Sequence, residues 1–161
     1  MLTQARLKEV LHYEPGTGVF TALVSAPHRP AGSRAGWVGG KGYRYVSIDG
    51  RTYRMNRLAW LYMTGSFPEA MVDHEDRNRG NDAWRNLRAA SGAENGRNCG
   101  LSKRNSSGVK GVYWYARHQK WNAQIRVNRK LMSLGYFADI GEAASARRAA
   151  EFLHFGAFAP A

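Results

Sequence analysis

The stretch that decides the fold of this chain is MVDHEDRNRGNDAWRNLRAASGAENGRN, residues 71–98. Two short segments that can form strands, residues 71–74 and 86–88, flank a loop rich in turn-forming residues. Ser91 followed by Glu94 is a capping-box pair, which starts a helix. The stretch therefore predicts two short strands, a polar loop between them and a helix after them.

Acidic side chains gather in this region, although the chain as a whole is basic. With 24 Lys and Arg against 12 Asp and Glu, its formal net charge is +12. Such an excess indicates a polyanionic partner, a property that ribosomal, membrane-surface and nuclease proteins share. The acidic residues of the region are Glu69, Asp73, Glu75, Asp76, Asp82 and Glu94. Carboxylates repel phosphate unless a divalent cation intervenes and reverses the local charge.

Asp73 and His74 are the residues best suited to metal-assisted phosphate chemistry. Mg²⁺ prefers a few carboxylate and amide oxygens and keeps waters or phosphate oxygens as its other ligands, so Asp73 can supply a charged ligand. A neutral histidine can take a proton from a water that attacks phosphorus. From the residues alone, a solvated turn is the alternative interpretation of DHEDRNRGND.

The same stretch resembles the ββα-metal motif of HNH endonucleases, in the homing-endonuclease branch found in phage and intron genes. That branch reads Asp-His, a loop of similar length, Asn-Leu-Arg and then a helix with Glu-Asn. The resemblance implies that Asp73 and Asn95 hold one Mg²⁺ or Mn²⁺ ion per site, that His74 is the general base, and that Asn86 ties the loop and orients His74. The metal would neutralise the scissile phosphate and stabilise the leaving 3′ oxygen, so that hydrolysis gives a 5′-phosphate.

The chain departs from the family pattern at two places. Relatives usually carry His-Arg-Leu-Ala-Trp before the motif, whereas residues 56–60 read NRLAW. Asn56 keeps polarity but cannot titrate near neutral pH, so any role of that histidine is lost or altered. The loop also reads Asn81-Asp82 where Asp-Asn is commoner.

Local signals predict further elements before the motif. Thr3 can cap a helix with apolar Leu7, Val10 and Leu11, and a short strand follows around residues 19–24. Residues 43–48 and 52–55 around Asp49-Gly50 predict a hairpin with a type I′ turn. Residues 57–63 form a predicted helix that Gly65 closes.

The run GLSKRNSSG, residues 100–108, predicts a basic linker to a second module. Strands are expected at 109–115, 120–127 and 130–137, and a helix at 140–154. Alternation places Trp121, Ala123, Ile125 and Val127 on one face of the middle strand, and Lys120, Asn122, Gln124 and Arg126 on the other. Because the helix is rich in alanine, it can cover the apolar face. The polar face suits the major groove of DNA, and an ordinary solvated face is the alternative.

This second module is similar to the Apetala-type (ethylene-response-factor) DNA-binding domain, which also occurs fused to phage HNH nucleases. SGVKGVYW, KWNAQIRV, SLGYF and EAASARRAA carry the resemblance across residues 106–158. The DNA contacts expected from the resemblance and from the basic linker are Lys103, Arg104, Lys110, Tyr113, Tyr115, Lys120, Gln124 and Arg126. Two of these positions are Arg in the plant domains and Tyr here, and Leu131 and Ser133 replace an Arg and a Trp. The base preference of the plant domains therefore does not transfer.

Together these features predict an α+β chain, in which a ββα-metal nuclease unit is followed by a three-stranded antiparallel sheet packed on one helix. The expected parts are an N-terminal lead-in (1–42), the HNH nuclease domain (43–99), the basic linker (100–108) and the Apetala-type domain (109–161). The predicted function is metal-dependent cleavage or nicking of DNA, with recognition by the C-terminal sheet. A DNA-binding protein or regulator that keeps the fold without cleaving is the first alternative. An RNA-binding or packaging protein is the second, and it explains the charge but not the ordered Asp-His, Asn and Asn set.

Partner and compartment follow from what the sequence contains. We expect a monomer that acts on double-stranded DNA, with no membrane and no small-molecule substrate. Cys99 stands alone, which excludes an intramolecular disulfide and a thiolate zinc site. The N-terminus is charged where a secretory signal is apolar, and no apolar run reaches about 18 residues. These features favour the cytoplasm, that of the host cell if a phage encodes the protein.

Overall fold

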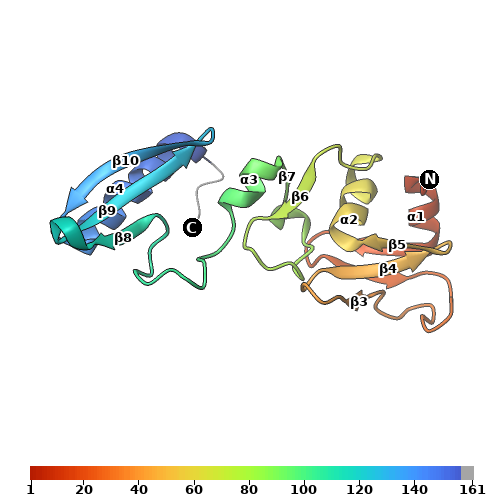
Figure 1. Ribbon diagram of the computed structural model, residues 1–161. Helices are drawn as coiled ribbons and strands as arrows, with labels where there is room; N and C mark the ends of the chain where they lie inside the picture. The colour runs from red at the N-terminus through yellow and green to blue at the C-terminus, as the bar shows by residue number, and fades with distance from the viewer. Residues whose placement is uncertain (157–161) are drawn as a thin grey trace. The chain divides into compact units, whose positions relative to one another are not determined.

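The computed structural model describes residues 1–156 and contains two compact units, Met1–Asn95 and a second that begins at Gly96 (Figure 1). The division comes before the polar segment 100–108, which lies within the second unit. Both units combine helices with antiparallel sheets. Among the described residues, no helix is long and apolar enough to cross a membrane.

The first unit begins with a short helix that turns directly into a strand. Thr3 caps α1 (Gln4–Val10) by accepting a hydrogen bond from the amide of Arg6. Leu11 was expected in the helix, but its backbone is extended and it starts β1. The helix is therefore shorter than its apolar spacing predicts. Strand β1 (Leu11–Glu14) pairs with β2 (Val19–Ala22), and β3 (Trp37–Val38) joins the next sheet.

The hairpin expected around Asp49-Gly50 is present. Strands β4 (Arg44–Ile48) and β5 (Arg51–Arg54) are antiparallel, and the φ angles of Asp49 (48°) and Gly50 (73°) fit a type I′ turn. Helix α2 (Met55–Thr64) follows at once and ends at Gly65, whose φ of 84° is the left-handed C-cap conformation. It starts two residues earlier than predicted, so its first turn includes Asn56.

The motif region itself forms a two-stranded hairpin followed by a helix. Strand β6 (Met71–His74) pairs antiparallel with β7 (Leu87–Ala90), with Asp73 opposite Arg88. Asn86, expected in the second strand, ends a short 3₁₀ helix, η1 (Trp84–Asn86). Helix α3 (Gly92–Arg97) has the predicted capping box, since the Ser91 amide donates to Glu94 and the Glu94 amide donates to the Ser91 hydroxyl.

One hydrophobic core joins residues 1–42 to the motif region. Buried Leu7, Tyr13 and Phe20 pack in the same cluster as Val46 and Leu58. A ββα unit alone has little apolar surface to bury, so it gains its interior from the N-terminal elements. Residues 1–42 are thus part of the unit that carries the motif.

The second unit is a three-stranded antiparallel sheet with one helix against it. The strands stand in the order β10 (Lys130–Phe137), β9 (Lys120–Val127), β8 (Val112–Tyr115), with η2 (Ala116–His118) between β8 and β9. Helix α4 (Ile140–Phe155) starts at Asp139, which accepts from the amides of Gly141 and Glu142. Ala123 packs with Ala143, and Ile125 with Ala150. Helix α4 therefore covers the face of β9 that the alternating sequence pattern predicts to be apolar.

Candidate active site

The catalytic candidates Asp73 and His74 are the last two residues of β6, and both side chains are buried. The Asp73 carboxylate faces Arg88 across the hairpin. Arg88 donates from Nε and Nη2 to Asp73 Oδ2, at 3.1 Å each. A buried carboxylate is costly without a partner, so the guanidinium compensates the charge of Asp73.

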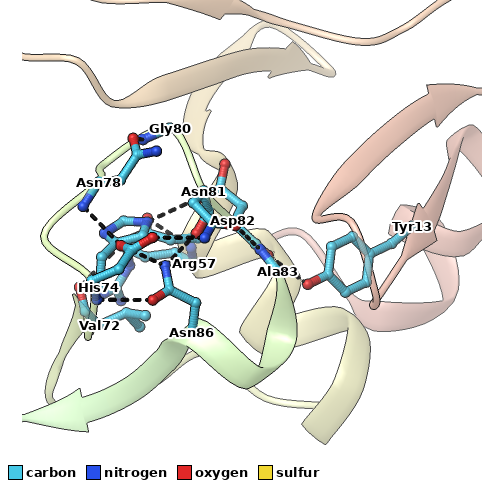
Figure 2. Close-up of polar contacts among 12 residues, drawn as sticks. Tyr13, Arg57, Val72, His74, Asn78, Gly80, Asn81, Asp82, Ala83 and Asn86 are labelled. Atoms are coloured by element: carbon cyan, nitrogen blue, oxygen red, sulfur yellow. Dashed lines mark hydrogen bonds and ion pairs between the residues drawn. The ribbon is translucent and has the colours of Figure 1, made fainter.

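The His74 ring is held by a carboxylate that was not predicted as a site residue. His74 Nε2 lies 3.1 Å from Asp82 Oδ1, and the two side chains are 3% and 1% exposed (Figure 2). Among the described residues, Asp82 Oδ2 is a buried oxygen with no hydrogen-bond partner. Asp82 thus depends on His74 to compensate its burial. A carboxylate in this position orients an imidazole.

Tyr13 supports the same loop from the hydrophobic core. Its hydroxyl donates to the main-chain oxygen of Asp82 at 2.7 Å, and Figure 2 shows the ring approaching the loop from the β1–β2 side. Burial of the phenol, with the charge of Asp82 adding to it, raises the pKa of Tyr13 well above its usual range. The hydroxyl therefore remains a donor, and it fixes the backbone that carries Asp82.

Asn86 ties the two ends of the loop between β6 and β7. Its Nδ2 donates to Asp76 Oδ1 (2.9 Å) and to the main-chain oxygen of Asn81 (2.8 Å). Its Oδ1 accepts from the amide of Asp76 at 3.0 Å. Figure 2 shows Asn86 beneath the loop, on the side of His74. The side chain therefore holds both the start and the end of the segment that positions Asp82.

The charge of Asp76 is set by this network. Its partial burial raises the pKa, but hydrogen bonds from the Asn81 side chain, the Asn78 amide and the Asn86 side chain, together with the charge on His74, lower it more. The net result is a pKa below the usual 3.8. Asp76 is therefore ionised throughout the neutral range, as an acceptor of three hydrogen bonds should be.

Asn56, where relatives carry histidine, has a structural role in this chain. It is buried in the first turn of α2, and its Nδ2 donates to the main-chain oxygen of Val72 at 3.2 Å. Its Oδ1 accepts from the amide of Arg57 at 2.9 Å. Because Val72 directly precedes Asp73, Asn56 links the start of α2 to the strand that carries the catalytic candidates.

The expected metal ligands are one carboxylate and one amide. Asp73 lies on β6, and Asn95 lies on α3, where it is half-buried and its amide donates to the Ser91 oxygen. No group of three His, Cys, Asp or Glu that could hold a metal exists among residues 1–156. A donor set of one carboxylate and one amide fits Mg²⁺, which takes its remaining ligands from water and phosphate. In the structure the cation beside this carboxylate is the guanidinium of Arg88, whose Nη2 lies 3.1 Å from Asp73 Oδ2.

The DNA-binding candidates of the second unit do not all lie on one face. The register pairs Tyr113 with Asn122 and Tyr115 with Lys120, so both tyrosines share the outer face of β9 with Gln124 and Arg126. Lys110 precedes β8, and its Nζ donates to the main-chain oxygens of Arg97 (2.9 Å) and Cys99 (3.0 Å). Lys103 and Arg104 are exposed in a turn before the sheet.

Comparison with known proteins shows what the motif region is similar to. Residues 53–97, from β5 to α3, match the model of the HNH endonuclease family. "Protein 3.8" of Escherichia phage T7 is 36% identical over 78 residues, which are 48% of this chain and 64% of that protein. The chain thus spans slightly less than two thirds of that relative's length. A solved structure titled "DNA binding and cleavage by the HNH homing endonuclease I-HmuI" is also similar. The match covers 55% of this chain and 51% of that one, with 21% sequence identity and a TM-score of 0.41.

Proposed function

We propose, with the HNH endonuclease match over residues 53–97 as the premise, that this protein is a divalent-metal-dependent DNA endonuclease. The observation that carries the proposal is the buried Asp73–His74 pair at the end of β6, inside the matched segment. A metal-ligating carboxylate next to a histidine base is a combination that can catalyse phosphodiester hydrolysis. The net charge of +12 suits a DNA substrate.

In this proposal His74 is the general base. Its imidazole takes a proton from water, while the water oxygen forms a bond to phosphorus. The bond from phosphorus to the 3′ oxygen breaks, and the leaving oxygen takes a proton from solvent. Asp82 stabilises the imidazolium that forms, as the acid of a catalytic triad does.

Asp73 and Asn95 would hold the metal ion, Mg²⁺ or Mn²⁺. When bound, the ion supplies neutralisation of the scissile phosphate and of the charge on the leaving 3′ oxygen. Asn86 acts through the loop, since its three hydrogen bonds keep Asp82, and through it His74, in place. These assignments give each polar side chain at the hairpin a distinct role in one reaction.

DNA recognition is assigned to the outer face of the C-terminal sheet, by its resemblance to Apetala-type domains. Tyr113, Tyr115, Lys120, Gln124 and Arg126 share that face, which supports the proposal. Lys103 and Arg104 would add phosphate contacts before the sheet, and Lys110 would support the turn there. We expect one protein molecule to bind duplex DNA.

Nicking of supercoiled plasmid tests the proposed activity. The protein should nick with Mg²⁺ or Mn²⁺ and not with EDTA, and His74→Ala should abolish nicking while duplex affinity stays within a few fold. The base contributes to the transition state and little to ground-state binding, which is why affinity is spared. Undiminished nicking by His74→Ala purified in parallel would remove the assignment and reveal a contaminating nuclease or another base.

A second candidate function is DNA binding without cleavage, and Asn56 is the observation that favours it. An asparagine bonded to Val72 stands where relatives have a histidine. If the unaltered protein fails to nick DNA with every divalent metal ion tested, DNA binding without cleavage replaces the first proposal. If the unaltered protein does nick DNA, the variant Asn56→His tests the role of this position. A faster nicking rate shows that Asn56 limits catalysis. An unchanged rate shows that the position is structural.

A further inference from the structure

We propose that Tyr43, Arg54 and Arg79 form a binding site for a DNA backbone phosphate next to His74. The inference rests on the proposed function, because it names the part of the substrate that this neighbouring site holds. The Tyr43 ring centroid lies 5.9 Å from that of His74. The guanidinium carbons of Arg54 and Arg79 lie 4.6 Å and 4.9 Å from the Tyr43 centroid. Two cations and a phenol thus adjoin the proposed base.

Three separate segments bring these side chains together. Tyr43 ends a tight turn, in which the amide of Gly39 donates to the Tyr43 oxygen and that of Gly42 donates to Gly39. Arg54 is the last residue of β5, opposite Tyr45. Arg79 comes from the loop after β6, and its Nη1 donates to the main-chain oxygen of Lys41 at 3.1 Å. The loop that carries Asp82 is therefore fastened to the turn that carries Tyr43.

Neither guanidinium is neutralised by the protein. Both arginines are exposed. Among the described residues, no carboxylate oxygen lies within 4.0 Å of a guanidinium nitrogen of Arg54 or Arg79. Two arginines of this unit differ in this respect, since Arg6 pairs with Asp49 at 3.0 Å and Arg88 with Asp73 at 3.1 Å. Two like charges on one ring repel each other, and an anion between or beside them removes that repulsion. The planar fork of a guanidinium fits phosphate oxygens in particular.

The distance to His74 places the site close to the scissile phosphate. The Tyr43 and His74 ring centroids are 5.9 Å apart. A phosphate bound by Tyr43, Arg54 and Arg79 would therefore be a neighbour of the phosphate on which His74 acts. Holding that phosphate positions the scissile bond at His74 without contact to the reacting atoms. The site reads no base sequence, since phosphate contacts position the duplex and base contacts specify it.

Duplex binding by the full chain in EDTA, over a range of salt concentrations, tests the site without any need for cleavage. Arg54→Ala and Arg79→Ala should each lower the slope of log K against log salt by about 0.9, and the double variant by about twice that. Between 50 and 200 mM salt, each change corresponds to about a threefold difference in relative affinity. Tyr43→Phe keeps the ring and should bind as the unaltered protein does.

Arg51→Ala is the matched control. Arg51 is exposed, lies on the same strand as Arg54, and points to the opposite face because the two residues are three positions apart. Its loss should leave the slope unchanged. Slopes that stay unchanged for both Arg54→Ala and Arg79→Ala, or an equal decrease for Arg51→Ala, would overturn the site. Because the readout is binding without metal, a protein that binds in this way but never nicks would contradict the proposed function and not the phosphate site.

Discussion

Asn86→Ala should unfold the first unit at a markedly lower temperature. The amide is buried and makes three hydrogen bonds of 2.8–3.0 Å, to Asp76 and Asn81. Each such bond contributes about 1 kcal/mol net, so its loss should cost about 3 kcal/mol of the free energy of unfolding. For a unit of this size that corresponds to about 10–20 °C in Tm. Differential scanning calorimetry of the full chain measures the shift in the transition of this unit.

Asn78→Ala is the control for this variant. Asn78 lies in the same loop but is exposed, and its side chain accepts one hydrogen bond, from the amide of Gly80 at 3.1 Å. We expect its loss to cost less than about 1 kcal/mol. If Asn86→Ala costs no more than Asn78→Ala, the loop is held by something other than Asn86 and the reasoning fails.

The destabilisation by Asn86→Ala should not depend on pH between 5.5 and 8. Asp76 has a folded pKa below its ordinary 3.8, so its contribution to stability is fully present above that value. The contribution is lost only as the pH falls below 3.8 and through the lower folded pKa. If the difference in Tm between the unaltered protein and Asn86→Ala is already smaller at pH 5.5, another titrating group controls the loop.

Three further outcomes follow from single contacts. Asn56→Ala should lower the free energy of unfolding in urea by about 1–3 kcal/mol, because the Val72 oxygen and the Arg57 amide lose their partner. Arg126→Ala should lower the salt slope of duplex binding by about one unit or cost base discrimination, whereas Arg148→Ala, a change of equal charge on α4, should do neither; equal losses would refute the sheet-face assignment. Arg147→Met should destabilise the second unit by about 3–5 kcal/mol, because it leaves the buried Glu151 carboxylate without the guanidinium that donates to it. Calorimetry measures this change.

Elements with a strong local signal could be predicted from the sequence. Strand β6, the Asp49-Gly50 turn, the Gly65 cap and the Ser91–Glu94 capping box each depend on neighbouring residues alone. In the second unit, β9 and β10 have the predicted bounds, and β8 starts at Val112 rather than residue 109. The preceding residues form a turn, in which Gly111 has a φ of 73°.

Contacts between distant segments could not be predicted. Leu11 fits the helical spacing of Leu7 and Val10, yet pairing with β2 draws it into a strand. Asp82 has no sequence signal as a partner of His74, since the loop fold alone brings the two together. Lys110 was placed among the DNA contacts by the resemblance to Apetala-type domains, which gave no sign that its ammonium donates to the main-chain oxygens of Arg97 and Cys99. In each case local pattern gives the residue type, and tertiary contacts decide what the residue does.

Stability and catalysis are coupled at this site, because its acids are buried inside a strongly basic protein. The positive field of the chain attracts DNA, but it does not solvate Asp73 or Asp82, which pair with Arg88 and His74. Removing His74 therefore removes both the proposed base and the compensation of a buried carboxylate. The effect of His74→Ala on nicking therefore has to be compared with the change in Tm of the same variant. The variant His74→Gln separates the two effects, because glutamine keeps a hydrogen-bond donor for Asp82 but cannot accept a proton near neutral pH. A loss of nicking common to both variants, with folding preserved in the glutamine form, is the result that assigns the chemistry to the imidazole.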